Sequence, residues 1–196
     1  MIKWLLLASG LYLLYEHSRK PRGPRKIVTL GDSITAGPYP RHLARKLAGT
    51  GHSVIQMGYG GKGVKHISNK LDEVIAHRPT DVVLLIGVND IASDRSPEYI
   101  NGRLDEIYNR LDAAGIHITA VPVLPWGSYR KYTPAREKVM LAVNDHIARA
   151  PQVDTRVNVT PMAQGKALHP SFTNDKLHPN QLGSEILADL VVDALF

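Results

Sequence analysis

The sequence predicts an α/β fold, a three-layer α/β/α sandwich with a five-stranded parallel sheet, preceded by a hydrophobic N-terminal helix. From Lys26 onward, short runs rich in β-branched residues alternate with longer helical patterns, which predicts strands and helices in turn. The run VVLLI at 82–86 is apolar at every position, which is typical of a parallel strand covered by helices on both faces. The 196 residues, of which 43% are hydrophobic, suffice for one domain with a sizeable core.

Each expected element has its own pattern or boundary signal. Ser96 and Thr133 are typical N-caps, each followed by a proline, and Gly115 is typical of the position after a helix end. Strands are expected at 26–30, 53–57, 81–87, 117–124 and 155–159, and helices at about 39–49, 64–77, 97–114, 134–149 and 180–196. Ligands of parallel sheets bind at the carboxyl ends of the strands, so a site is expected at that edge.

The N-terminal segment predicts membrane association. We expect residues 1–17 to form a hydrophobic anchor, 18–25 a basic linker and 26–196 the folded domain. The uncharged run from Trp4 to Tyr15 would span about 18 Å as a helix, short of the ~30 Å hydrocarbon core unless flanking residues snorkel. No small-x-small cleavage site follows it, which favours an uncleaved anchor. A cleaved signal peptide and a helix packed on the domain remain open.

The net charge of +6 belongs mainly to this terminus. Residues 1–26 hold six basic residues and one acidic one, which leaves the body of the chain at +1. A nearly neutral body predicts no nucleic-acid partner. The positive-inside rule places the flank after the apolar run on the cytoplasmic side. The absence of cysteine excludes disulfides, thiolate metal sites and a cysteine nucleophile.

Polar and glycine residues follow the expected strands where each strand ends. Ser33 follows the first strand, and Gly61 and Asn89 follow the second and third. Just before the last helix, Asp175 and His178 are three residues apart, so the carboxylate can reach Nδ1 of the imidazole. Together these residues predict nucleophilic acyl transfer, with Ser33 as nucleophile, His178 as general base and Asp175 orienting it. The N–H groups of Ser33 and Gly61 and the amide of Asn89 are the expected oxyanion donors.

These residues also carry a family resemblance. GDSI at 31–34, GYGG at 58–61, GVND at 87–90 and DKLHP at 175–179 resemble the four sequence blocks of the SGNH hydrolase superfamily, the GDSL esterases and lipases. The resemblance covers about 26–196 and implies an SGNH or flavodoxin-like α/β/α fold, a Ser-His-Asp triad, and no metal or other cofactor. It also implies export, which conflicts with the charge rule. Ile34 stands where the family name has leucine, and the short connection after Gly37 predicts a pocket open on that side.

The resemblance implies an esterase acting on a small-molecule ester, a glycan or a lipid: a short-chain acyl or acetyl ester, a carbohydrate O-acetyl group or a lysophospholipid. Segments 125–134 and 162–174 are expected to flank the pocket and set specificity. In the first of them, Trp126 and Tyr129 are expected to stack on a sugar or an acyl chain.

Two other functions stay open. The chain can be a non-catalytic, membrane-tethered interaction domain on the same fold, which a structure with Ser33 and His178 apart would favour. It can also be a nucleotide-binding module, because 58–63 matches G-x-G-x-x-G between a strand and a helix. Against the latter, the motif follows the second strand, and Asp81, where a ribose-binding acid is expected, begins a strand instead of ending one.

Overall fold

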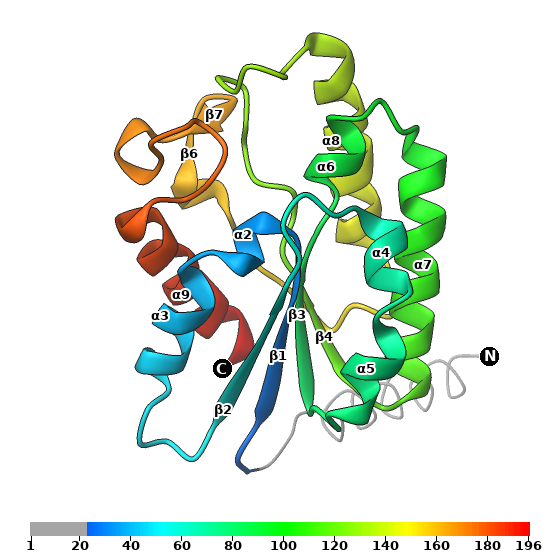
Figure 1. Cartoon of the computed structure of the whole chain (residues 1–196), viewed down its shortest axis with the longest axis vertical. Helices are drawn as coiled ribbons and strands as arrows, with labels where there is room; N and C mark the ends of the chain where they lie inside the picture. Colours follow the sequence, from blue (N-terminus) through cyan, green and yellow to red (C-terminus); the bar gives the residue numbers. More distant parts are fainter. Residues whose placement is uncertain (1–22) are drawn as a thin grey trace, which may run out of the picture.

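The computed structural model describes residues 23–196 and confirms the predicted sandwich. The predicted anchor at 1–17 and residues 18–22 of the linker lie outside the described residues. Five parallel strands form one sheet in the order β2-β1-β3-β4-β5 (Figure 1). They are β1 (Lys26–Gly31), β2 (Ser53–Gly58), β3 (Asp81–Leu85), β4 (His117–Ala120) and β5 (Thr155–Arg156). Among residues 23–196, none of the helices is both long enough and apolar enough to cross a bilayer.

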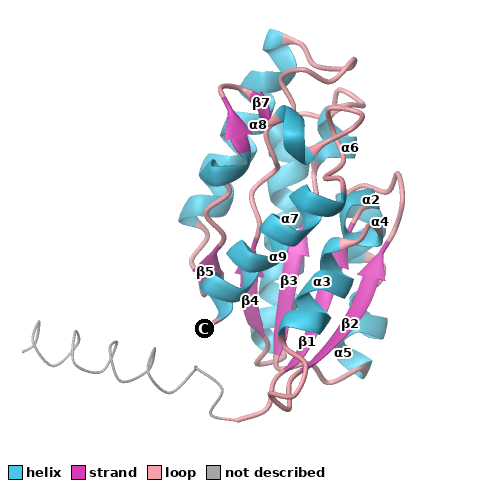
Figure 2. Ribbon diagram, turned by 90° about the vertical axis from the view of Figure 1, so that its left-hand side faces the viewer, coloured by secondary structure: helices cyan, strands magenta, loops and turns pink. Residues whose placement is uncertain are grey.

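Helices cover both faces of the sheet because successive strand residues point to opposite sides. Ile27 packs in one apolar cluster and Val28 in the other, and both are fully buried. The cluster of Ile27 includes residues of α3 (Tyr39–Lys46) and α9 (Gln181–Leu195). The cluster of Val28 includes residues of α4 (Val64–Ser68), α5 (Leu71–Ala76), α7 (Pro97–Ala113) and α8 (Pro134–Arg149). Figure 2 shows the two helical layers on either side of the strands.

Several elements are shorter than the sequence predicts. The helix expected at 64–77 is interrupted between α4 and α5 at Asn69 and Lys70, and asparagine is a weak helix former. The strand expected at 117–124 ends at Ala120, shortly before Pro122, which lacks the N–H that a sheet ladder needs. The strand expected at 155–159 ends at Arg156.

Short elements gather beyond the carboxyl ends of the strands. The sequence does not predict them because segments of two to four residues carry no periodicity. They are α2 (Ser33–Ala36), α6 (Val88–Ile91), the 3₁₀ turns Thr160–Met162 and Pro170–Phe172, and the antiparallel pair β6 (Ala163–Gln164) and β7 (Ala167–Leu168). Ser33 lies in α2 and Asn89 in α6, and Asp175 and His178 follow the second 3₁₀ turn.

Candidate active site

The ends of the neighbouring strands β2, β1 and β3 meet in register. Gly31 of β1 pairs with Gly58 of β2 on one side and with Leu85 of β3 on the other. The N–H of Tyr59 donates to the carbonyl of Gly31 over 2.8 Å, so the turn after β2 is tied to the end of β1. The segments that follow these strands, which carry Ser33, Gly61 and Asn89, therefore lie at one edge of the sheet, as the fold predicts (Figure 1).

Ser33 is the first residue of α2, and the packing of this short helix explains two glycines. A side chain at Gly31 would run into the Leu85 carbonyl and the Thr35 hydroxyl. A side chain at Gly58 would run into the backbone of Thr35 and Ala36. The Asp32 carboxylate caps the helix by accepting the N–H of Ile34 over 2.9 Å. Within the described residues the Ser33 N–H donates to no other group, so it is available to a ligand.

His178 and Asp175 reach this point from the loop before α9. Nε2 of His178 lies 2.8 Å from Oγ of Ser33, and Nδ1 lies 2.6 Å from Oδ2 of Asp175. An ionised carboxylate only accepts hydrogen bonds, so Nδ1–H donates to Asp175 and the lone pair of Nε2 faces the Ser33 hydroxyl. The side chains of His178 and Asp175 are 41% and 51% exposed, so the site is open to solvent.

The loop around Asp175 keeps its carboxyl ionised. Burial raises the pKa of Asp175, but hydrogen bonds from the ring and backbone N–H of His178 and from the N–H of Leu177 outweigh it and bring the pKa to about 2. Lys176, between Asp175 and these donors, adopts φ 70°, which lets the chain fold back over the carboxylate. Asp175 is therefore a charged acceptor at any pH near neutrality.

Asn89 joins the turn that carries Gly61 to the turn that follows β3. The Nδ2 group of Asn89, in α6, donates to the carbonyl of Lys62 over 3.0 Å, which ties the turn after β3 to the turn after β2. Gly61 has φ +70°, a conformation that favours glycine, and its N–H makes no backbone hydrogen bond within the described residues. Among the described residues, the second proton of the Asn89 amide and the N–H groups of Ser33 and Gly61 have no protein acceptor.

The expectation that Trp126 stacks on a substrate is wrong for this structure. Its side chain is 0% exposed and belongs to the core cluster on the α7–α8 side of the sheet. The rings of Tyr129 and Tyr132 lie on it, with centroids at 6.2 and 6.3 Å. Trp126 therefore anchors the segment 125–134 in the core, whereas Tyr129 is half-buried and keeps part of its surface accessible.

The glycine turn at 58–63 does not offer a phosphate site. Val64 begins α4, and its N–H already donates to Oδ2 of Asp90 over 2.9 Å. A side chain at Gly63 would run into the same carboxylate. Because Asp90 occupies the helix N-terminus with a negative charge, a pyrophosphate would meet repulsion where a dinucleotide fold offers free N–H groups. The nucleotide-binding interpretation is therefore set aside.

Asp32 is a buried acid that the sequence analysis did not single out, although an aspartate directly before a short helix is an N-cap signal. It is 0% exposed, and its Oδ2 has no hydrogen-bond partner among the described residues. Burial raises the pKa of Asp32 to about 7, against the lowering effects of the Ile34 N–H and of His178. The acid is thus neutral in the folded protein at mildly acidic pH and carries a buried charge at alkaline pH.

The substitution Asp32→Asn is expected to stabilise the fold in a pH-dependent way. The pKa of Asp32 rises from near 4 in the unfolded chain to about 7 in the folded one. The protonated acid therefore leaves the wild type fully stable below pH 4, and this stability is lost as pH rises through 7. Asparagine is neutral throughout and keeps an oxygen for the Ile34 cap. Urea unfolding at pH 4, 6 and 8 should show a growing advantage for the variant, reaching a few kcal/mol. The exposed control Asp193→Asn should show no such trend; equal effects at all three pH values for Asp32→Asn would contradict the argument.

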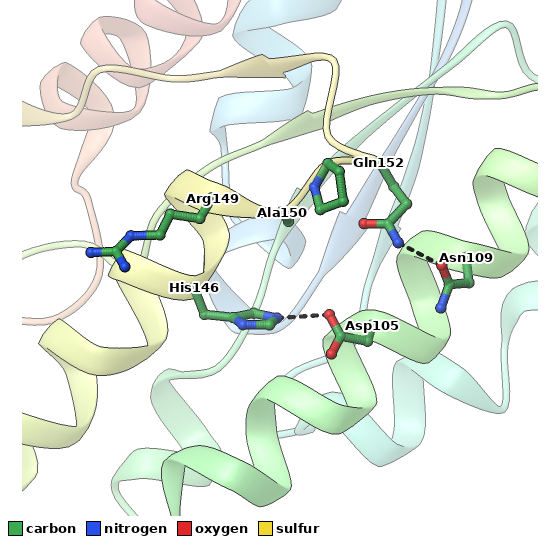
Figure 3. A pocket seen from close by; sticks show the side chains of 7 residues that line it. Asp105, Asn109, His146, Arg149, Ala150 and Gln152 are labelled. Carbon is green, nitrogen blue, oxygen red and sulfur yellow. Dashed lines mark hydrogen bonds and ion pairs between the residues drawn. The ribbon is translucent and has the colours of Figure 1, made fainter.

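Another aspartate–histidine pair lies in a cleft of about 380 Å³ that is lined by α7, the end of α8 and residues 150–152 (Figure 3). Nε2 of His146 is 2.7 Å from Oδ1 of Asp105, and Gln152 donates to Asn109 beside them. No serine, threonine or tyrosine lines this cleft. It therefore lacks the hydroxyl that a covalent hydrolytic mechanism requires.

The chain is similar to known proteins in sequence and in fold. The family model described as the GDSL-like lipase/acylhydrolase family matches residues 29–186. The chain is similar to a GDSL-like lipase from Bacteroides thetaiotaomicron, with a TM-score of 0.75, 25% identity and coverage of 95% of this chain and 96% of that one. It is also similar to a lipase/acylhydrolase from Enterococcus faecalis, with a TM-score of 0.71, 26% identity and coverage of 86% and 94%.

An acetylxylan esterase from Geobacillus stearothermophilus shares the fold, with a TM-score of 0.73, 19% identity and coverage of 90% of this chain and 96% of that one. None of the curated protein sequences matches the chain. The resemblance stated from the four sequence blocks is confirmed by the family match.

Proposed function

The chain belongs to the GDSL-like lipase/acylhydrolase family and is a hydrolase of ester bonds, and on that premise we propose that Ser33, His178 and Asp175 form its catalytic triad. One observation carries the proposal: Oγ of Ser33 is 2.8 Å from Nε2 of His178, whose Nδ1 is 2.6 Å from Asp175. This is the reach that a nucleophile and its general base need. A non-catalytic interaction domain has no use for that alignment.

The proposed reaction proceeds through an acyl-enzyme. Ser33 Oγ attacks the carbonyl carbon of the ester while His178 Nε2 takes the hydroxyl proton. The bond between that carbon and the alcohol oxygen then breaks, and His178 returns the proton to the leaving oxygen. A water molecule repeats the two steps on the acyl-enzyme, which releases the carboxylic acid and restores Ser33. Asp175 holds the ring and stabilises the imidazolium in each half.

The negative oxygen of each tetrahedral intermediate needs fixed donors. We assign this role to the N–H groups of Ser33 and Gly61 and to the free amide proton of Asn89. The hydrogen bond from Asn89 to the Lys62 carbonyl holds the amide in place, so little reorganisation is needed when charge develops. The N-terminal end of α2 adds its peptide dipoles on the same side.

We propose a small acyl group on the substrate. The side chains of His178 and Asp175 are about half exposed. The connection between α2 and α3 consists only of Gly37 and Pro38, and Trp126 is buried in the core. A long acyl chain gains affinity from burial in an apolar groove, whereas an acetyl or butyryl group does not depend on one. An open site also admits a bulky alcohol part, such as a sugar.

The test uses p-nitrophenyl esters from acetate to palmitate and a fluorophosphonate probe, with the full chain in detergent. Turnover is expected to fall at least tenfold between the short and the long esters. The probe is expected to add one phosphonyl group to the peptide that contains Ser33 and none to the Ser33→Ala variant. Labelling of a different residue would overturn the triad assignment, and a preference for palmitate would overturn the substrate assignment.

Substitution of Asn89 tests the oxyanion assignment. Asn89→Ala is expected to lower kcat on the order of 100- to 1,000-fold with little change in KM, because the lost donor acts on the transition state. Asn89→Asp has the same shape but places a carboxylate oxygen beside the developing charge, so its kcat should fall further. Asn109→Ala, in the cleft of Figure 3, is the matched control and should keep normal turnover. A rise in KM alone would contradict the assignment.

We also propose that residues 1–17 anchor the chain to a membrane, as their apolar run suggests. Flotation of the full chain with phosphatidylcholine vesicles tests this. The chain should move with the vesicles in high salt, whereas a variant with Leu6 and Leu13 changed to lysine should stay behind. Release of the wild type by salt would contradict insertion.

A further inference from the structure

The N-terminal segment enters the domain at the edge of the sheet where the strands begin. The site lies at the opposite edge, where the strands end. Gly23, Pro24 and Arg25 precede β1, and the carbonyl of Arg25 accepts the N–H of Ser53 at the start of β2. In a parallel sheet all strands begin at one edge and end at the other. The six residues of β1 separate Arg25 from the turn that carries Ser33 by about 20 Å. Figure 1 shows the start of β1 at the lower edge of the sheet and α2 at the upper one.

Arg25 is held firmly at that edge. It is 9% exposed, and its guanidinium donates to the carbonyl of Leu195 over 2.8 Å and to the buried carboxylate of Asp81 over 3.2 Å. The guanidinium carbon also lies 4.7 Å from the ring centroid of Phe196, and the Arg25 N–H donates to His52 over 2.8 Å. Because a buried ion pair is costly to separate, Arg25 and the residues that follow it stay bound to the domain.

We call these contacts of Arg25 the clamp and the segment 16–24 the tether. The clamp sets the length of chain that is left to span the distance from the membrane to the domain. Nine residues lie between Tyr15, the last residue of the apolar run, and Arg25. Fully extended, they span about 35 Å, and about 30 Å in the extended form that prolines favour. Arg19, Lys20 and Arg22 shorten this reach further on an anionic surface, because each gains ~1 kcal/mol by staying near the headgroups.

A tether of this length cannot turn the site onto its own membrane. A domain of about 170 residues is roughly 40 Å across. For the carboxyl edge of the sheet to face the bilayer, the linker would have to run from Arg25 along the flank of the domain, beyond Ser33 and past the loops that stand above it. That path is at least the width of the domain, roughly 40 Å, whereas the nine residues span about 35 Å when fully extended.

We infer that the anchored enzyme acts on esters held in the aqueous phase and not on lipid esters seated in the bilayer that carries it. This inference rests on the proposed esterase function and on the proposed anchor. Because the clamp at Arg25 holds the opposite edge of the sheet near the supporting membrane, the site faces away from that membrane. A substrate must therefore come from solution, or it must be part of a hydrated molecule that extends from the bilayer by about the width of the domain.

The test uses the full chain in phosphatidylcholine vesicles and one chromophore in two forms. Soluble 7-acetoxycoumarin measures the esterase activity itself, and the same acetyl ester linked to phosphatidylethanolamine in the same vesicles measures attack on the supporting membrane. A variant with a twenty-residue glycine-serine segment inserted between Arg22 and Gly23 provides the comparison, because the insertion adds a flexible reach of about 25 Å. The same variant with Ser33→Ala corrects for spontaneous hydrolysis.

The wild type and the insertion variant are expected to hydrolyse the soluble ester equally, while the insertion raises the rate on the lipid-borne ester at least tenfold. Equal rates of the two proteins on the lipid-borne ester would overturn the inference. So would failure of the wild type to remain with the vesicles. Loss of activity on the soluble ester in both proteins would instead refute the proposed function, which keeps the two failures distinct.

Discussion

The Ser33→Ala variant is expected to lose at least on the order of 10⁴ in kcat on p-nitrophenyl acetate. The alanine leaves no atom that can form the acyl-enzyme, and Nε2 of His178 loses the hydroxyl that it meets at 2.8 Å. The N–H donors of Ser33 and Gly61 are unaffected, because they belong to the backbone. Residual turnover above the spontaneous rate is therefore expected, and it should no longer give a burst of p-nitrophenol.

His178→Ala should lower kcat by a similar factor, because the nucleophile and its base act as one unit. The double variant Ser33→Ala, His178→Ala is then expected to be no slower than either single variant. Additive losses would show that the two residues act independently and would contradict the triad. His146→Ala is the matched control, since His146 also pairs with a carboxylate, Asp105 at 2.7 Å, but lies in the cleft of Figure 3.

Strands β1 and β2 could be predicted closely from the sequence, and the short elements could not. β1 and β2 begin where their β-branched runs begin and extend one residue beyond the expected ends, because β-branched residues favour strands. The pair β6 and β7, with two residues each, depends on tertiary contacts such as the bridge between Trp126 and Ala167. Local sequence carries no trace of such contacts.

The positions of the site residues follow from strand ends, whereas their surroundings do not. Ser33, Gly61 and Asn89 each stand within four residues of a strand end, so the topology brings them to one edge. The burial of Trp126 depends on how residues 125–134 fold onto α8, and an aromatic residue in a loop gives no sign of which face it turns inward. The raised pKa of Asp32 likewise depends on the depth of its burial.

The Asp175→Asn variant is expected to lose on the order of 10³ to 10⁴ in kcat although its shape is unchanged. Its remaining oxygen can still accept the N–H groups of Leu177 and His178, which keeps the loop folded. The new amide group, in contrast, donates toward Nδ1 of the imidazole. The ring must then carry its proton on Nε2, which can no longer accept the proton of Ser33.

Nitrogen NMR of the imidazole separates this effect from a structural one. In the wild type at pH 8, Nδ1 should carry the proton of the neutral ring, and in Asp175→Asn the proton should move to Nε2. The control Asp145→Asn changes a carboxylate that pairs with Arg149 on the surface, and it should alter neither the tautomer nor kcat. Because the pKa of Asp175 is about 2, its charge is constant from pH 5 to 9, so the wild-type activity in that range should not follow the titration of this acid. Full activity of the variant with the proton on Nε2 would show that His178 does not act as the base.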